Sequence, residues 1–173
     1  KAISNGYPMG AVVGKREFME PAADMFLSSS YWSDNIGITA SITTIRELKR
    51  RNSPARFKEI GEGIRAAVKD ALDDVGISGD VVGLFNSPRL ELDLPDESLR
   101  PKVTTLFIQE MAKRGVHTSG GFMATLAHTE EDIRITADAA RESLEVIRKG
   151  LEGSIEDLLE AKEKREAIQR IVR

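Results

Sequence analysis

The first fourteen residues, KAISNGYPMGAVVG, constrain the fold of this chain more than any other stretch. Lys1 is followed by a proline at position 8 and by three glycines, Gly6, Gly10 and Gly14. Because glycine has no Cβ atom and tolerates positive φ angles, its backbone can approach another group closely. The apolar run 11–13 predicts a short buried strand between two of these glycines. We therefore expect a tight backbone turn with room for a flat, polar group.

The composition narrows the class of protein. Of the 173 residues, 25 are basic and 28 are acidic, and they are spread along the chain with a net charge of −3. The chain therefore has no basic face of the kind that would predict a nucleic-acid partner or binding to an anionic membrane. The chain has no cysteine, which argues against a disulfide framework, a thiolate metal site and a cysteine nucleophile. No apolar run approaches the ~18 residues of a membrane span, so we expect a cytoplasmic protein.

Helical and strand-like patterns alternate along the chain and predict an α/β or α+β lobe. Apolar residues at helical spacing predict a helix over 38–48. They form one face: Ile38, Ile42, Ile45 and Leu48. A second helix is expected to begin with Ser53 as its N-cap and to end at Gly76. A third helix is expected to begin near Pro101 and to end before Gly115.

The second half of the chain combines strands with one more helix. Residues 81–85 and 90–94 predict two strands, joined through the turn-forming residues 86–88. Residues 115–127 are interpreted as a strand and a glycine turn. Thr129–Asp132 resembles a capping box, which predicts that a long helix begins there.

The loop 28–35, with the sequence SSSYWSDN, is rich in hydroxyl groups and precedes the helix expected over 38–48. The spacing favours a simple role, in which Ser33, Asp34 or Asn35 caps that helix. The alternative is an anion site, because the N–H groups and the dipole of a helix N-terminus both favour negative charge.

Residues 151–173 differ in character from the rest, since 11 of these 23 residues are charged. Pairs such as Glu160 with Lys164 are spaced i, i+4, which predicts a solvated terminal helix. The apolar residues of this segment suffice for docking but identify no partner.

The two histidines, His117 and His128, give no metal site. They lie eleven residues apart, and no third nitrogen or thiolate ligand is near them in the sequence. We assign neither histidine a role.

Two segments carry a resemblance to a known family. The opening segment resembles the Schiff-base segment of the class III aminotransferases, pyridoxal-phosphate enzymes of fold type I that include glutamate-1-semialdehyde aminomutase. Residues 121–133, GFMATLAHTEEDI, are similar to the segment that opens the last small-domain helix in the aminomutase branch. The resemblance implies that Lys1 is the catalytic residue, because the family's lysine at this place binds the cofactor as an imine. On spacing alone, Lys1 would be interpreted as a solvated charge.

The resemblance also implies a domain organisation. The family's chains are much longer, so we expect this α/β chain to be the C-terminal portion of a larger polypeptide. Residues 1–52 would end the large cofactor-binding domain, 53–150 would form the small α/β domain, and 151–173 would be the charged terminal helix. The phosphate loop, the ring-stacking aromatic residue and the acidic partner of the pyridine nitrogen would precede Lys1.

Ser29 or Ser30 is expected to help bind pyridoxal 5'-phosphate. In related enzymes a Thr or Ser in the matching loop reaches the cofactor phosphate of the neighbouring subunit, which implies a homodimer with a shared active site. This chain departs from the aminomutase motif GTLSGNP, because Tyr31 and Trp32 are inserted there.

Three functions remain open at the level of the sequence. The first is transfer of an amino group from an amine or amino acid to an oxo acid or aldehyde. The second is intramolecular aminomutation, which the match over 122–133 favours and the sequence of loop 28–35 disfavours. The third is a non-catalytic relative that acts as a binding or scaffold protein. Gly121 stands where ornithine- and aminobutyrate-type relatives carry a carboxylate-clamping arginine, so we expect any such clamp to lie in the N-terminal half of the polypeptide.

Overall fold

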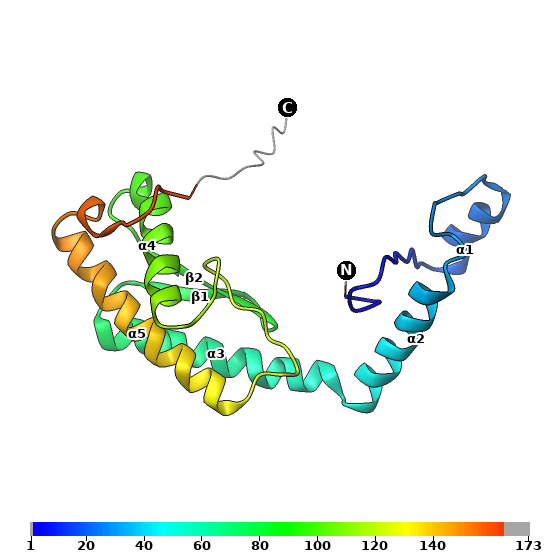
Figure 1. The fold of residues 1–173 in the computed structure, drawn as a ribbon, viewed down its shortest axis with the longest axis horizontal. Coiled ribbons are helices and arrows are strands. Elements are labelled where there is room, and N and C mark those ends of the chain that lie inside the picture. The colour runs from blue at the N-terminus through cyan, green and yellow to red at the C-terminus, as the bar shows by residue number, and fades with distance from the viewer. Residues whose placement is uncertain (1, 165–173) are drawn as a thin grey trace. The chain divides into compact units, whose positions relative to one another are not determined.

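A computed structural model describes residues 2–164, and the chain divides into two compact units, Lys1–Pro54 and Ala55–Arg173 (Figure 1). The first unit is built on helix α2 (Asn35–Arg50), which the short helix α1 (Arg16–Met19) and the 3₁₀ turn η1 (Glu20–Asp24) precede. Asp34 caps α2, since its carboxylate accepts a hydrogen bond from the Ile36 N–H at 3.0 Å. The helix expected over 38–48 is therefore confirmed, and so is capping from within the loop.

The strand expected over 11–13 is wrong. Val12 and Val13 are 84% and 88% exposed, and neither lies in a strand. A strand needs a neighbour to pair its backbone N–H and C=O groups. Among residues 2–54 there is no strand to supply that neighbour. The apolar face of α2 is also partly open, with Ile38, Ile42 and Ile45 each 39–45% exposed.

Up to residue 164, the second unit consists of three long helices and one hairpin, with short 3₁₀ turns. Helix α3 (Ser53–Val75) leads into it and is followed by β1 (Gly79–Leu84) and β2 (Ser87–Leu92). Helix α4 (Arg100–Lys113), which the turn η2 (Glu97–Leu99) precedes, and helix α5 (Glu130–Glu152) complete the unit. Gly76, with φ +75°, and Gly115, with φ +81°, end α3 and α4 as expected.

The strands form an antiparallel pair in which Val81 lies opposite Leu90. The turn begins one residue and ends two residues earlier than expected, because Phe85 and Asn86 form it while Ser87 and Pro88 already belong to β2. Pro88 has no backbone N–H to donate, but its carbonyl still accepts the Phe122 N–H at 2.8 Å. The strand expected within 115–127 is reduced to a single bridge between Gly121 and Arg89.

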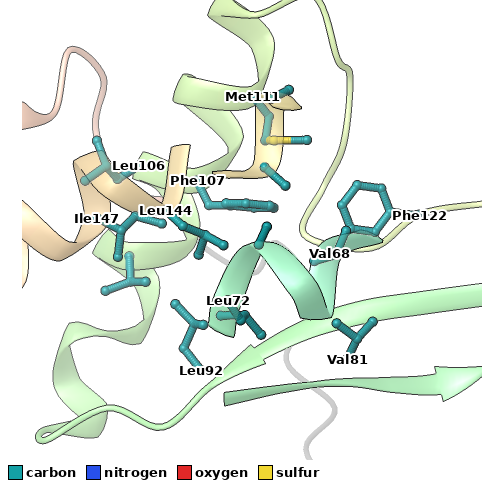
Figure 2. Packing of buried hydrophobic residues seen from close by; sticks show 14 of the residues in the cluster. Val68, Leu72, Val81, Leu92, Leu106, Phe107, Met111, Phe122, Leu144 and Ile147 are labelled. Atoms are coloured by element: carbon teal, nitrogen blue, oxygen red, sulfur yellow. The ribbon is translucent and has the colours of Figure 1, made fainter. Parts of the chain in front are cut away.

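One hydrophobic core holds this unit together, and Figure 2 shows its packing. Helix α3 contributes Val68 and Leu72, and the hairpin contributes Val81 and Leu92, all 5% exposed or less. Helices α4 and α5 close the core from the other side. Their labelled side chains are Leu106, Phe107, Met111, Leu144 and Ile147. In the sequence Leu106, Phe107 and Met111, like Leu144 and Ile147, lie at helical spacing, which is typical of one buried face on each helix.

The capping box opens α5 as expected. The Thr129 hydroxyl accepts the Asp132 N–H, and the Asp132 carboxylate accepts the Thr129 N–H at 2.8 Å. No helix within residues 2–164 is long and apolar enough to cross a membrane.

The charged helix expected over 151–173 is not what the described residues form. Helix α5 ends at Glu152, and 153–164 contain only the 3₁₀ turn η3 (Glu156–Leu158). The chain turns back because Ile155, 3% exposed, packs on Gly150, where an added Cβ would lie 3.0 Å from the Ile155 Cγ1. Residues 165–173 lie outside the described residues, and the domain boundaries after 52 and 150 stay predictions.

Candidate functional site

The opening segment folds into a compact turn on α2. The Ser4 side chain is 1% exposed, and its hydroxyl donates a hydrogen bond to the Tyr7 carbonyl. Positive φ angles at Asn5 (49°) and Gly6 (112°) reverse the backbone there. The expected glycine-dependent turn is therefore present at Gly6. Lys1 itself lies outside the described residues, so its catalytic role stays a prediction.

The opening segment packs closely against a glycine of α2, Gly37. A Cβ atom on Gly37 would lie 2.7 Å from the carbonyl oxygen of Pro8 and 3.6 Å from the Met9 Cβ. Only a residue without a side chain lets the two backbones come so close. Gly37 was not singled out from the sequence, where it is an isolated glycine in a helical pattern.

Two hollows flank the segment. The first, of about 430 Å³, lies between Pro8–Gly10 and the loop that contains Ser29, Tyr31 and Trp32. The second, of about 550 Å³, lies between the turn 4–7 and the first half of α2. Hydroxyl-bearing residues of α2 line this second hollow: Thr39, Thr43 and Thr44. Their spacing at i, i+4 and i+5 was the available sequence signal.

The structure separates the two serine candidates. Ser29 lines the first hollow and Ser30 does not. The Ser29 Oγ accepts a long hydrogen bond of 3.4 Å from the Tyr31 N–H, which leaves its own O–H free to donate. The Ser29 carbonyl accepts the Trp32 N–H at 3.2 Å and so bends the loop.

The hollow beside Pro8–Gly10 has one group that favours a phosphate and one that disfavours it. Hydroxyls such as that of Ser29 are suitable donors to a phosphate oxygen. Asp34 lines the same hollow and carries a negative charge that repels an anion. One of its oxygens is turned onto the Ile36 N–H, which disperses part of that charge at the helix N-terminus. Both serines remain candidates, and Ser29 is the better placed.

The histidines stay without a role. His117 and His128 line one hollow of about 310 Å³, and His128 Nδ1 accepts the Thr125 N–H at 3.0 Å. Within residues 2–164 no group of three or more potential ligands gathers to hold a metal ion.

Comparison with known proteins gives relatives over most of the chain. It is 31% identical over 155 residues to a 3-aminobutyryl-CoA aminotransferase of Cloacimonas acidaminovorans, covering 87% of this chain and 37% of that protein. It is 30% identical over 164 residues to a glutamate-1-semialdehyde 2,1-aminomutase of Halalkalibacterium halodurans, covering 86% of this chain and 38% of that protein. No protein-family model matches the chain.

Solved structures show the same relationship. A transaminase with pyridoxal phosphate bound is 26% identical, has a TM-score of 0.75, and is matched over 88% of this chain and 38% of its own. An omega-transaminase from Sphaerobacter thermophilus, 21% identical with a TM-score of 0.72, shares the fold over 84% of this chain and 37% of its own.

Over most of its length the chain has the α/β fold of part of a transaminase that binds pyridoxal phosphate, and it is similar in sequence to an aminotransferase. The relatives that match it are aminotransferases and glutamate-1-semialdehyde aminomutases, the proteins that the resemblance to the class III aminotransferases predicts. It spans less than two fifths of the length of these relatives.

Proposed function

We propose that the chain is part of an enzyme that uses pyridoxal 5'-phosphate to move an amino group from an amine or amino acid to an oxo acid or aldehyde. The observation that carries this proposal is the 31% identity to an aminotransferase over 155 residues. The likeness to a transaminase with bound pyridoxal phosphate supports the choice of cofactor.

The proposed chemistry assigns a role to each candidate residue. The cofactor supplies an electron sink for the carbon that loses its proton. The Lys1 amine attaches the cofactor covalently and carries that proton, for which it must be partly neutral. The Ser29 or Ser30 hydroxyl donates a hydrogen bond to the cofactor's phosphate.

A second function is favoured by a specific observation. Three of the curated relatives are glutamate-1-semialdehyde 2,1-aminomutases, at 28–30% identity. The two reactions differ in the need for an acceptor, because an aminomutase keeps the nitrogen within one substrate. We prefer the aminotransferase, since Tyr31 and Trp32, where the sequence departs from the aminomutase motif, line the hollow beside the opening segment. A non-catalytic scaffold is the third and least favoured function, because Lys1 is retained.

The deciding experiment supplies the cofactor-loaded protein with glutamate-1-semialdehyde and no acceptor. In parallel, it receives a panel of amines with pyruvate or 2-oxoglutarate. We expect turnover only with the amines and an oxo acid. Repeated turnover of the semialdehyde alone would establish the aminomutase instead.

A separate experiment tests Lys1 without relying on turnover. Borohydride reduction of the cofactor-loaded protein, followed by peptide mapping, should place the pyridoxyl group on Lys1. A colourless protein with no modified peptide would support the scaffold function.

We further propose a homodimer with a shared site and a cytoplasmic location. The position of Ser29 and Ser30 in their loop supports the shared site. The even balance of basic and acidic residues supports the cytoplasmic location, because it predicts neither a nucleic-acid nor a membrane partner.

A further inference from the structure

The second unit contains a hollow of about 490 Å³ between β2, the first half of α4 and residues 119–121. Its inner wall is apolar and belongs to the core, because Leu92, Val103 and Phe107 are all buried. Leu92 and Phe107 are labelled in Figure 2. Its lining also carries three charged side chains, from Arg89, Glu91 and Arg100. An apolar wall with few polar groups is typical of a small-molecule site.

The two arginines differ in how strongly a carboxylate of the protein already pairs with their guanidinium group. The Arg100 guanidinium binds both Glu97 oxygens at 2.5 Å and also donates to the Leu92 carbonyl at 3.3 Å. Its charge and its direction are therefore fixed. The Arg89 side chain is 65% exposed, and the nearest carboxylate oxygen, on Glu91, lies 3.9 Å away. A pair this long and this exposed is weak, so the Arg89 guanidinium keeps donors to spare.

The backbone holds Arg89 at the mouth of the hollow. Arg89 forms a bridge with Gly121, and the Leu90 N–H donates to the Gly120 carbonyl at 3.3 Å. A Cβ atom on Gly121 would lie 3.4 Å from the Arg89 Cβ. The missing side chain of Gly121 therefore leaves the space beside Arg89 open.

We propose that this hollow binds an oxyanion, a carboxylate or a phosphate group, with Arg89 as its counter-charge. The planar guanidinium has the geometry to bind such a group through two parallel hydrogen bonds. The Thr104 and Ser119 hydroxyls line the same hollow and are further donors. Glu91 competes with the ligand for Arg89. The identity of the oxyanion as part of an amino-transfer substrate rests on the proposed function, whereas the binding of an oxyanion does not.

The test is an NMR titration of the full chain with succinate and, separately, with inorganic phosphate. We expect saturable shifts of the Gly120 and Gly121 amides, and the tighter of the two probes identifies the oxyanion. Arg89→Ala should weaken binding about 10-fold, and Arg89→Lys should weaken it less. Glu91→Gln should tighten binding, because it removes the competing carboxylate. Opposite changes from two neighbouring, exposed residues are not expected from a loss of folding.

Arg16→Ala is the matched control. Arg16 is also an exposed arginine with a loose partner, Glu20 at 3.6 Å, but it belongs to the first unit. Equal weakening by Arg16→Ala, or unchanged binding in Arg89→Ala, would overturn the proposal. Enzyme kinetics test the substrate: Arg89→Ala should raise KM for an amino acid and leave KM for an amine without a carboxylate group unchanged. If the protein transfers no amino group, the proposed function is refuted, but the result on oxyanion binding stays valid.

Discussion

Gly61 and Phe85 meet backbone to backbone, since a Cβ atom added to Gly61 would lie 1.6 Å from the carbonyl oxygen of Phe85. This contact seats the turn of the hairpin on helix α3. Gly61→Ala must separate the two, and we expect the free energy of unfolding to fall by more than about 2 kcal/mol. Urea denaturation of the full chain measures it.

Gly63, two residues further along α3, is the matched control. A Cβ there would meet the Ile133 Cδ1 at 3.0 Å, the far end of a flexible side chain. Gly63→Ala should be neutral or stabilising by up to about 1 kcal/mol, because alanine favours the helix. Equal destabilisation by both changes would show that helix geometry, and not the Phe85 contact, sets the cost.

Glu110 is a buried carboxylate, 5% exposed, which links three segments. It accepts hydrogen bonds from Lys113 and Arg114, each at 2.8 Å. Lys113 also binds Glu160, and Arg114 also binds Glu142 of α5. Burial alone would raise the pKa of Glu110, but the hydrogen bonds from Lys113, Arg114 and Gln109 outweigh it and lower this pKa to about 2.

The depressed pKa of Glu110 predicts how stability depends on pH. The unfolded chain binds a proton near the ordinary pKa of 4.5, and the folded chain only near 2, so acid favours unfolding. The contribution of Glu110 is full above pH 4.5 and is lost as the pH falls toward 2. Glu110→Gln should cost about 1–3 kcal/mol at neutral pH, and that cost should shrink across this window. Glu145→Gln, an exposed change on α5, should show neither effect.

Local sequence signals predict the second unit well. The helices that begin near Ser53, Pro101 and Thr129 appear where caps and apolar spacing place them, because these signals act within a few residues. The expected strand over 11–13 and the expected terminal helix depend on contacts with residues elsewhere in the chain, and the structure contains neither among the described residues. The run 11–13 forms no strand without a neighbour, and 153–164 turns back because Ile155 and Leu158 find Gly150.

The candidate site divides in the same way. The resemblance identifies Lys1, Ser29 and Ser30, but only the fold shows that Ser29, not Ser30, lines a hollow with Pro8–Gly10. Arg89 and Gly121 are 32 positions apart, so their bridge has no signal in a single sequence. Such contacts between segments are set by the packing of the whole unit.

Ser29 and Ser30 should differ in their effect on cofactor affinity. If the Ser29 hydroxyl donates to the phosphate, Ser29→Ala should raise the dissociation constant of pyridoxal phosphate about 10-fold, the value of one hydrogen bond to a charged group. Ser30→Ala should then change it little. Fluorescence titration of the unreduced protein measures both. The reverse order would assign the phosphate contact to Ser30.

A mixture of an inactive variant and a variant of weakened cofactor affinity, assayed at limiting pyridoxal phosphate, tests whether the active site is shared between subunits. In a shared site, Lys1 of one subunit and the serine of its partner act together. Lys1→Ala has no attachment point for the cofactor, and the double variant Ser29→Ala with Ser30→Ala has no hydroxyl donor. When the two proteins are unfolded together and refolded, each mixed dimer regains one site in which both parts are intact. Random pairing then restores about a quarter of the wild-type activity. A site built within one chain always retains one defect, so a mixture no more active than its two components would exclude sharing.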